Sequence, residues 1–222
     1  MIISVHIPKT AGTSLGWGLR DRFGARLLED YADRPLSDSP EDEQRRAVTR
    51  ERVRDSGPEL LSRYDAVHGH FIADKYAALP GAPLFCVVLR DPVERSASHH
   101  QQWTELPNPV NAMSRKVIEE RLDLPTFTAL PGQAGLYQLF LGTMPLEHFS
   151  VVGLTEAYGE TLQLFEAVTG VPIPGRTDNV APAKPLIDAA AYKSLAALQP
   201  ENMRLYDHAR RRFEMLCRQF GI

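Results

Sequence analysis

Short apolar runs alternate with segments of helical periodicity along the chain. Residues 2–7 are nearly all apolar and rich in β-branched side chains, which is typical of a strand buried in a parallel sheet. Residues 8–13 are mostly small or turn-forming, and residues 14–23 then place apolar side chains at the spacing of one helix face. The start of the chain therefore predicts a strand, a loop and a helix in that order.

Two later segments repeat this order. Leu84–Leu89 predicts a buried strand, which is followed after a turn by a helix over Val93–Trp103. Val151–Leu154 predicts another strand, with a helix over Glu156–Thr169, and a weaker strand is expected over Ala66–His70. Strands that alternate with helices indicate an α/β fold with a mainly parallel sheet flanked by helices.

The remaining segments differ from these strand and helix units. Residues 37–56 are dominated by charges of both signs and predict a solvated helix, while residues 200–222 have the pattern of a packing helix. Residues 105–135 are interrupted by prolines and suggest helical insertions over the edge of the sheet. Because ligands of open α/β sheets lie beyond the carboxyl ends of the strands, we expect these insertions to form a ligand cleft.

Length, charge and cysteine content limit the possible functions. The 222 residues, 43% of them apolar, suit one domain over residues 1–222. A net charge of −3 gives no reason to expect nucleic acid or an anionic membrane as partner, so any anion site must be local. Cys86 and Cys217 lie in apolar surroundings and predict core positions. Without an apolar stretch of about 20 residues we expect no membrane span and a cytoplasmic location; the sequence leaves the oligomeric state open.

The first chemical motif is the loop between the first strand and the first helix. Main-chain N–H groups and the helix dipole make such a junction an anion site. Two small residues allow close approach of an oxyanion, three hydroxyl groups can donate hydrogen bonds, and a lysine adds positive charge. The residues expected to bind the anion are Lys9, Thr10, Ala11, Gly12, Thr13 and Ser14.

Two other interpretations of this loop stay open. The phosphate loop of kinases and ATPases places its lysine directly after the second glycine, whereas Lys9 precedes Gly12 by three residues and no earlier glycine exists. A nucleoside triphosphate is therefore a weaker prediction. In the simplest interpretation, Thr13 or Ser14 merely caps the helix and Lys9 is a surface charge.

A second motif follows the strand at Leu84–Leu89. Arg90 stands at the carboxyl end of that strand, and Ser98 follows eight residues later on the next helix. An arginine and a serine in this arrangement can bracket one phosphate group. Two separated anion sites on one sheet suit a ligand with anionic groups at both ends, such as 3′-phosphoadenosine 5′-phosphosulfate (PAPS).

These two motifs resemble those of the PAPS-dependent sulfotransferases. Ile7–Ser14 is similar to their 5′-phosphosulfate-binding motif, and Leu89–Ser98 is similar to their 3′-phosphate-binding motif, including the spacing from arginine to serine. The run from Pro8 to Ala11 and the triplet His68-Gly69-His70 resemble the carbohydrate-type branch that contains heparan sulfate 2-O-sulfotransferase. Weaker resemblance continues through residues 151–156 and 179–184.

The resemblance implies a P-loop-like fold with an acceptor cleft and a role for each motif residue. Lys9 would stabilise the leaving nucleotide, His70 would be the general base that accepts the hydroxyl proton, and His68 would support it. The proline-rich loop over residues 175–185 has two interpretations from its own composition: Arg176 or Lys184 lies near a phosphate, or the loop is an exposed connection with solvated charges. PAPS would be the co-substrate, no metal would be required, and the acceptor would be a carbohydrate or a small molecule.

Neighbouring histidines and two other function classes remain alternatives. We expect His6 to be a packing or loop-orienting residue, while His99 and His100 either touch the ligand or cover their helix. The competing functions are an atypical nucleotide-dependent kinase, which would need ATP and magnesium, and a catalytically silent nucleotide-binding module that contacts a protein.

Overall fold

A parallel sheet lies at the centre of the structure, a computed structural model that describes residues 1–108, 111–175 and 187–222. Within these residues five strands form one sheet in the order β2-β3-β1-β4-β5, and all neighbouring strands are parallel. The strands are β1 (Ile2–Val5), β2 (Leu27–Asp30), β3 (Ala66–Gly69), β4 (Leu84–Leu89) and β5 (Phe149–Leu154). The predicted α/β fold with a parallel sheet is thus confirmed.

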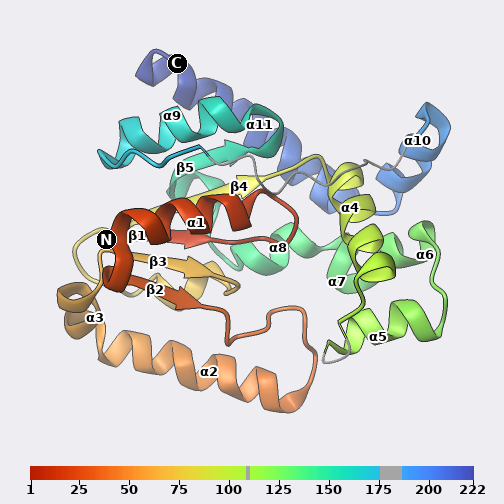
Figure 1. The fold of residues 1–222 in the computed structure, drawn as a ribbon, viewed down its shortest axis with the longest axis horizontal. Helices are drawn as coiled ribbons and strands as arrows, with labels where there is room; N and C mark the ends of the chain where they lie inside the picture. The colour runs from red at the N-terminus through yellow and green to blue at the C-terminus, as the bar shows by residue number, and fades with distance from the viewer. Residues whose placement is uncertain (109–110, 176–186) are drawn as a thin grey trace.

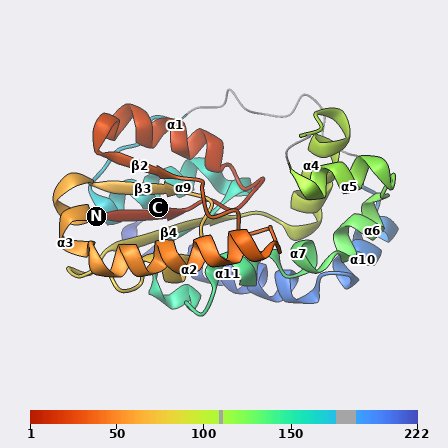
Figure 2. The ribbon, with the colours of Figure 1, turned by 90° about the horizontal axis from the view of Figure 1, so that it is seen from below.

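Helices cover both faces of this sheet. Helices α1 and α9 pack on one face, and α8 and α11 pack on the other, while α2 runs along the β2 edge (Figures 1 and 2). The helices of these layers are α1 (Gly12–Phe23), α2 (Pro40–Asp55), α3 (Gly57–Arg63), α8 (Leu136–Leu141), α9 (Tyr158–Thr169) and α11 (Pro200–Phe220). Short 3-10 turns are η1 (Gly24–Arg26), η2 (Ala73–Tyr76), η3 (Leu146–His148) and η4 (Thr155–Ala157).

A second group of helices lies beyond the carboxyl ends of the strands (Figures 1 and 2). It consists of α4 (Pro92–Glu105), α5 (Ala112–Glu119), α6 (Leu124–Ala129), α7 (Pro131–Ala134) and α10 (Ala189–Ala197). Trp103, Val117 and Phe127 form a small apolar cluster of their own within this group. The predicted helical insertions are therefore present, and the acceptor cleft between them stays a prediction.

The predicted strands and helices are present with ends that differ by a few residues, while β2, α3, α8 and α10 were not predicted. Helix α1 begins at Gly12, two residues before the predicted start, and β3 ends at Gly69, so that His70 lies just beyond the strand. The prediction lacked β2, in which only Leu27 and Leu28 are apolar. That strand occupies the edge of the sheet, where a short and partly polar sequence is sufficient.

Strand register brings the two sequence motifs together. Val5 of β1 lies opposite Gly69 of β3 on one side and opposite Val87 of β4 on the other. The loop after β1, the residue after β3 and the end of β4 therefore meet at one edge of the sheet.

Both cysteines belong to the core, and the helices show no membrane-spanning character in the described residues. Cys86 and Cys217 are unpaired and buried, as the sequence predicted. Within the described ranges, no helix has the length and apolar character that crossing a membrane requires.

Candidate functional site

The loop after β1 has an unusual main-chain conformation. Lys9 and Ala11 have φ angles of 70° and 60°, in the left-handed region that residues with a side chain usually avoid. Each such residue costs about 1 kcal/mol or more, so the surrounding structure must hold it. The Thr10 hydroxyl does so in part, because it donates a hydrogen bond to the Ile7 carbonyl at 2.9 Å. Left-handed residues are common in loops whose successive N–H groups face one anion, so this conformation is compatible with an anion site.

Helix α1 begins directly from this loop without a side-chain cap. Its N-cap residue is Ala11, whereas α4 is capped by Asp91, whose carboxylate accepts hydrogen bonds from Val93 N and Glu94 N at 3.0 Å. The first N–H groups of a helix need an acceptor, and the positive end of the helix dipole favours an anion. The start of α1 is thus open to an oxyanion.

The hydroxyl groups of this loop differ in what they can contact. Thr10 is buried and its hydroxyl is engaged with the main chain, so it would offer an anion its N–H group rather than its side chain. Thr13 is exposed in the first turn of α1, and Ser14 is buried there. Of the three predicted hydroxyl donors, only Thr10 already donates its hydroxyl hydrogen to a described main-chain group.

Lys9 and Arg90 follow the neighbouring strands β1 and β4, and their positive charges repel each other. Burial lowers the pKa of the half-buried Lys9 ammonium, and the positive charge of Arg90 lowers it further. Lys9 makes no hydrogen bond or ion pair with any other residue in the described part of the chain. Two cations that repel each other in this way favour an anion between or beside them.

Arg90 and Ser98 occupy the positions that the second motif predicts. Arg90 follows β4 with its side chain only 14% exposed, and its guanidinium lies 3.3 Å from the Glu94 carboxylate. Ser98 lies on α4 and is nearly buried, and no described residue is hydrogen-bonded to its hydroxyl. A phosphate at Arg90 would therefore compete with Glu94 for the guanidinium.

His68 is held between the sheet and the loop. Its Nδ1 lies 2.9 Å from the Ser4 hydroxyl and its Nε2 lies 3.1 Å from the Gly12 carbonyl. A carbonyl can only accept, so Nε2 carries the proton and Nδ1 accepts from Ser4. Burial lowers the pKa of His68 to about 3, which keeps the ring neutral. Since both ring nitrogens are engaged and the residue is 1% exposed, His68 links the sheet to the start of α1.

His70 has a different arrangement from His68. Its Nδ1 donates to the His6 carbonyl at 2.6 Å, so the neutral ring has a lone pair on Nε2. No described residue is hydrogen-bonded to that nitrogen. Burial lowers the pKa of His70, which keeps the ring in the form that accepts a proton. These are the properties that a general base needs.

His6 packs against both of these histidines, as expected from the sequence. Its ring centroid lies 5.0 Å from that of His68 and 4.3 Å from that of His70. The Tyr31 hydroxyl lies 3.1 Å from His6 Nδ1, and the Tyr31 ring meets that of His70 edge to face at 4.9 Å. Tyr31 is 40% exposed and follows β2. The sequence analysis did not single it out, because the strand before it was not predicted.

Two glycines of α1 make room for the histidine rings. A Cβ atom on Gly12 would lie 1.8 Å from His6 Cδ2, and one on Gly16 would lie 2.8 Å from His68 Nε2. These glycines are four residues apart, so they share one helix face. The histidines therefore take the space that side chains of α1 would otherwise fill.

His99 and His100 both pack among the helices beyond the sheet, while the predicted alternative of ligand contact stays a prediction. His99 is buried against Trp103, with ring centroids 4.1 Å apart, and its Nδ1 lies 3.3 Å from the Arg95 guanidinium. His100 Nε2 lies 2.7 Å from the Leu122 carbonyl, to which it donates. Both rings thus support the helices beyond the sheet.

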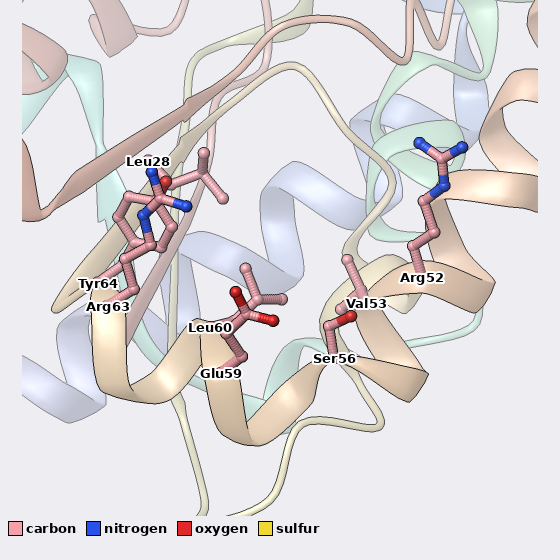
Figure 3. Close-up of a pocket in the computed structure, with 8 residues that line it drawn as sticks. All are labelled: Leu28, Arg52, Val53, Ser56, Glu59, Leu60, Arg63 and Tyr64. Atoms are coloured by element: carbon pink, nitrogen blue, oxygen red, sulfur yellow. The ribbon is translucent and has the colours of Figure 1, made fainter.

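The structure also contains a hollow away from the predicted site (Figure 3). It has a volume of about 260 Å³ and is lined by residues of β2, α2 and α3, together with Ser56 between the two helices and Tyr64 after α3. None of the predicted site residues lines it. Lys184 lies outside the described residues, so its predicted contact with a phosphate stays a prediction.

Comparison with known proteins gives no match. No family model and no curated protein matches the chain. Among residues 1–108, 111–175 and 187–222, no group of three or more His, Cys, Asp or Glu side chains is placed to hold a metal ion. Function must therefore be inferred from the geometry of the loop, Arg90 and His70.

Proposed function

We propose that this chain is a sulfotransferase with a P-loop-like fold that transfers the sulfuryl group of PAPS to a hydroxyl of a carbohydrate or small-molecule acceptor. The observation that carries the proposal is the uncapped loop with left-handed residues at Lys9 and Ala11, which follows β1, while Arg90 follows the adjacent parallel strand β4. A nucleotide with anionic groups at its 3′ and 5′ positions matches two neighbouring anion sites of this kind.

Each end of the nucleotide has a distinct set of partners in this proposal. The main-chain N–H groups of residues 9–14 would receive the 5′-phosphosulfate, and Lys9 would neutralise it. Arg90 and Ser98 would receive the 3′-phosphate, with Glu94 displaced from the guanidinium. The absence of a described carboxylate partner for Lys9 leaves its charge available to the ligand.

The transfer needs one proton acceptor and one stabilised leaving group. His70 Nε2 takes the proton of the acceptor hydroxyl while its oxygen forms a bond to sulfur. The bond from sulfur to the bridging oxygen breaks on the opposite side, and adenosine 3′,5′-bisphosphate leaves with that electron pair. Lys9 stabilises the negative charge that develops on the bridging oxygen. We propose no metal ion for this step.

An assay with isotopically labelled PAPS and a panel of sugar, glycolipid and phenol acceptors tests the activity. Label should reach an acceptor in the presence of a chelator. Label transfer from the γ-phosphate of ATP that depends on magnesium would instead support the kinase alternative. If the chain binds the nucleotide but transfers neither group to any acceptor, it is the silent binding module.

A binding measurement tests the second anion site separately. Adenosine 3′,5′-bisphosphate should raise the melting temperature more than adenosine 5′-monophosphate does, and Arg90→Ala should remove the difference. At one hundred times its dissociation constant the bisphosphate stabilises the fold by about 2.7 kcal/mol. Equal shifts for the two nucleotides would contradict the assignment of Arg90 and Ser98.

A further inference from the structure

The main chain at the carboxyl end of β4 loses its sheet partners just where Arg90 stands. The pairing of β4 with β5 ends at Leu89, opposite Leu154. Buried N–H and C=O groups beyond that point need other partners, because an unpaired buried polar group destabilises the fold. The partners that the structure provides are side chains.

Three side chains replace the sheet over three consecutive residues. The Thr155 hydroxyl donates to the Leu89 carbonyl at 3.1 Å, and Asp91 N–H donates to the Glu156 carboxylate at 2.7 Å. Between them, Arg90 N–H donates to the Tyr137 hydroxyl at 3.4 Å, and that hydroxyl donates in turn to the Arg90 carbonyl. One phenol thus satisfies both main-chain groups of Arg90.

Tyr137 is itself fixed by burial and by a hydrogen-bond network. It is fully buried on α8, and its N–H donates to the Asn202 side chain of α11 at 3.1 Å. Asn202 donates to the Gln133 carbonyl at 2.7 Å, and the Gln133 side chain accepts from Arg95 at 3.0 Å. Burial raises the pKa of the Tyr137 phenol, so it keeps the proton that it donates to Arg90.

We propose that Tyr137 is a positioning residue that holds the main chain of Arg90, and through it the guanidinium, in place for the 3′-phosphate of a nucleotide. This inference rests on the proposed function, because it assigns that phosphate to Arg90. Tyr137 does not touch the nucleotide; it acts through Arg90 alone.

The test compares Tyr137→Phe with Tyr76→Phe. Tyr76 is also buried and its hydroxyl also donates a hydrogen bond, to Asp30 at 2.8 Å, but Asp30 lies on β2, three strand positions from β4. Isothermal titration calorimetry gives the dissociation constants of adenosine 3′,5′-bisphosphate and adenosine 5′-monophosphate for each variant. The ratio of the two constants measures the contribution of the 3′-phosphate.

Tyr137→Phe should reduce this preference for the bisphosphate about tenfold, the scale of weakening one hydrogen bond from the Arg90 guanidinium to the charged 3′-phosphate. Tyr76→Phe should leave the preference unchanged. In an Arg90→Ala background, Tyr137→Phe should have no further effect on the ratio, because the two residues act as one unit.

Each contrary result overturns a defined part of the proposal. A wild-type chain with no preference for the bisphosphate contradicts the proposed function, and the role of Tyr137 with it. A wild-type preference that Tyr137→Phe retains contradicts only the positioning role. A Tyr137→Phe chain that does not fold shows that the hydroxyl is needed by the core as a whole, and this also overturns the inference.

Discussion

Lowering the pH should destabilise the fold through His68, and the size of the effect follows from its burial. His68 is 1% exposed, with a pKa of about 3 in the folded chain. An unfolded histidine has a pKa of about 6.5. Because the folded value is the lower one, the unfolded chain takes up a proton first as the pH falls below 6.5, and protonation then favours unfolding.

Linkage gives the magnitude of this loss. At pH 5 the His68 contribution is about 2 kcal/mol of destabilisation, and it is smaller at pH 7 and larger toward pH 3. The value at pH 5 is the same for any folded-state pKa below about 4, since the folded ring is then neutral at that pH.

The variant His68→Gln isolates this contribution. Glutamine can still donate to the Gly12 carbonyl, but it does not titrate. Urea unfolding of both proteins at pH 7 and pH 5 gives their free energies of unfolding. We expect the stability advantage of the wild-type chain to shrink by about 2 kcal/mol between the two pH values. The same comparison with the exposed His148 replaced by glutamine controls for loss of an imidazole. If the advantage is the same at both pH values, His68 is not locked in its neutral form and the assigned hydrogen-bond pattern is wrong.

Three further predictions concern the site itself. Lys9→Ala should reduce turnover of labelled PAPS by roughly 10²–10³, and normal turnover would make Lys9 a spectator. His70→Ala should fold and bind adenosine 3′,5′-bisphosphate but lose about 10²–10⁴ in turnover; in the wild-type chain, turnover should persist below pH 6.5, because burial lowers the pKa of this base. Glu94→Gln should tighten bisphosphate binding about twofold to fivefold in calorimetry, since the carboxylate that competes for Arg90 is removed; an equal gain for the monophosphate would exclude this cause.

Most of the fold could be predicted because buried parallel strands have a strong apolar signal. The strand at Leu84–Leu89 and the charged helix within residues 37–56 follow directly from side-chain type. Strand β2 could not be predicted, because a four-residue edge strand with two polar positions has no distinct pattern. Tyr31, which follows β2, was missed for the same reason.

The site could be predicted only as far as local sequence determines it. The order of small, hydroxyl and basic residues in the loop indicated an anion site, but the left-handed conformation of Lys9 and Ala11 depends on contacts with Ile7 and the sheet. The different hydrogen-bond arrangements of His68 and His70 could not be predicted from the sequence either. They are set by the long-range partners Gly12 and His6, which no spacing rule contains.

The fit between α1 and the histidines makes their sequence positions depend on one another. Alanine at position 16 is incompatible with histidine at position 68, and alanine at position 12 is incompatible with histidine at position 6, unless the helix moves away from the sheet. Any such movement would shift the Gly12 carbonyl and the start of α1, and thus the anion site. In directed evolution these four positions should therefore change in matched pairs, with a larger residue on the helix accepted only after a smaller one has replaced the imidazole.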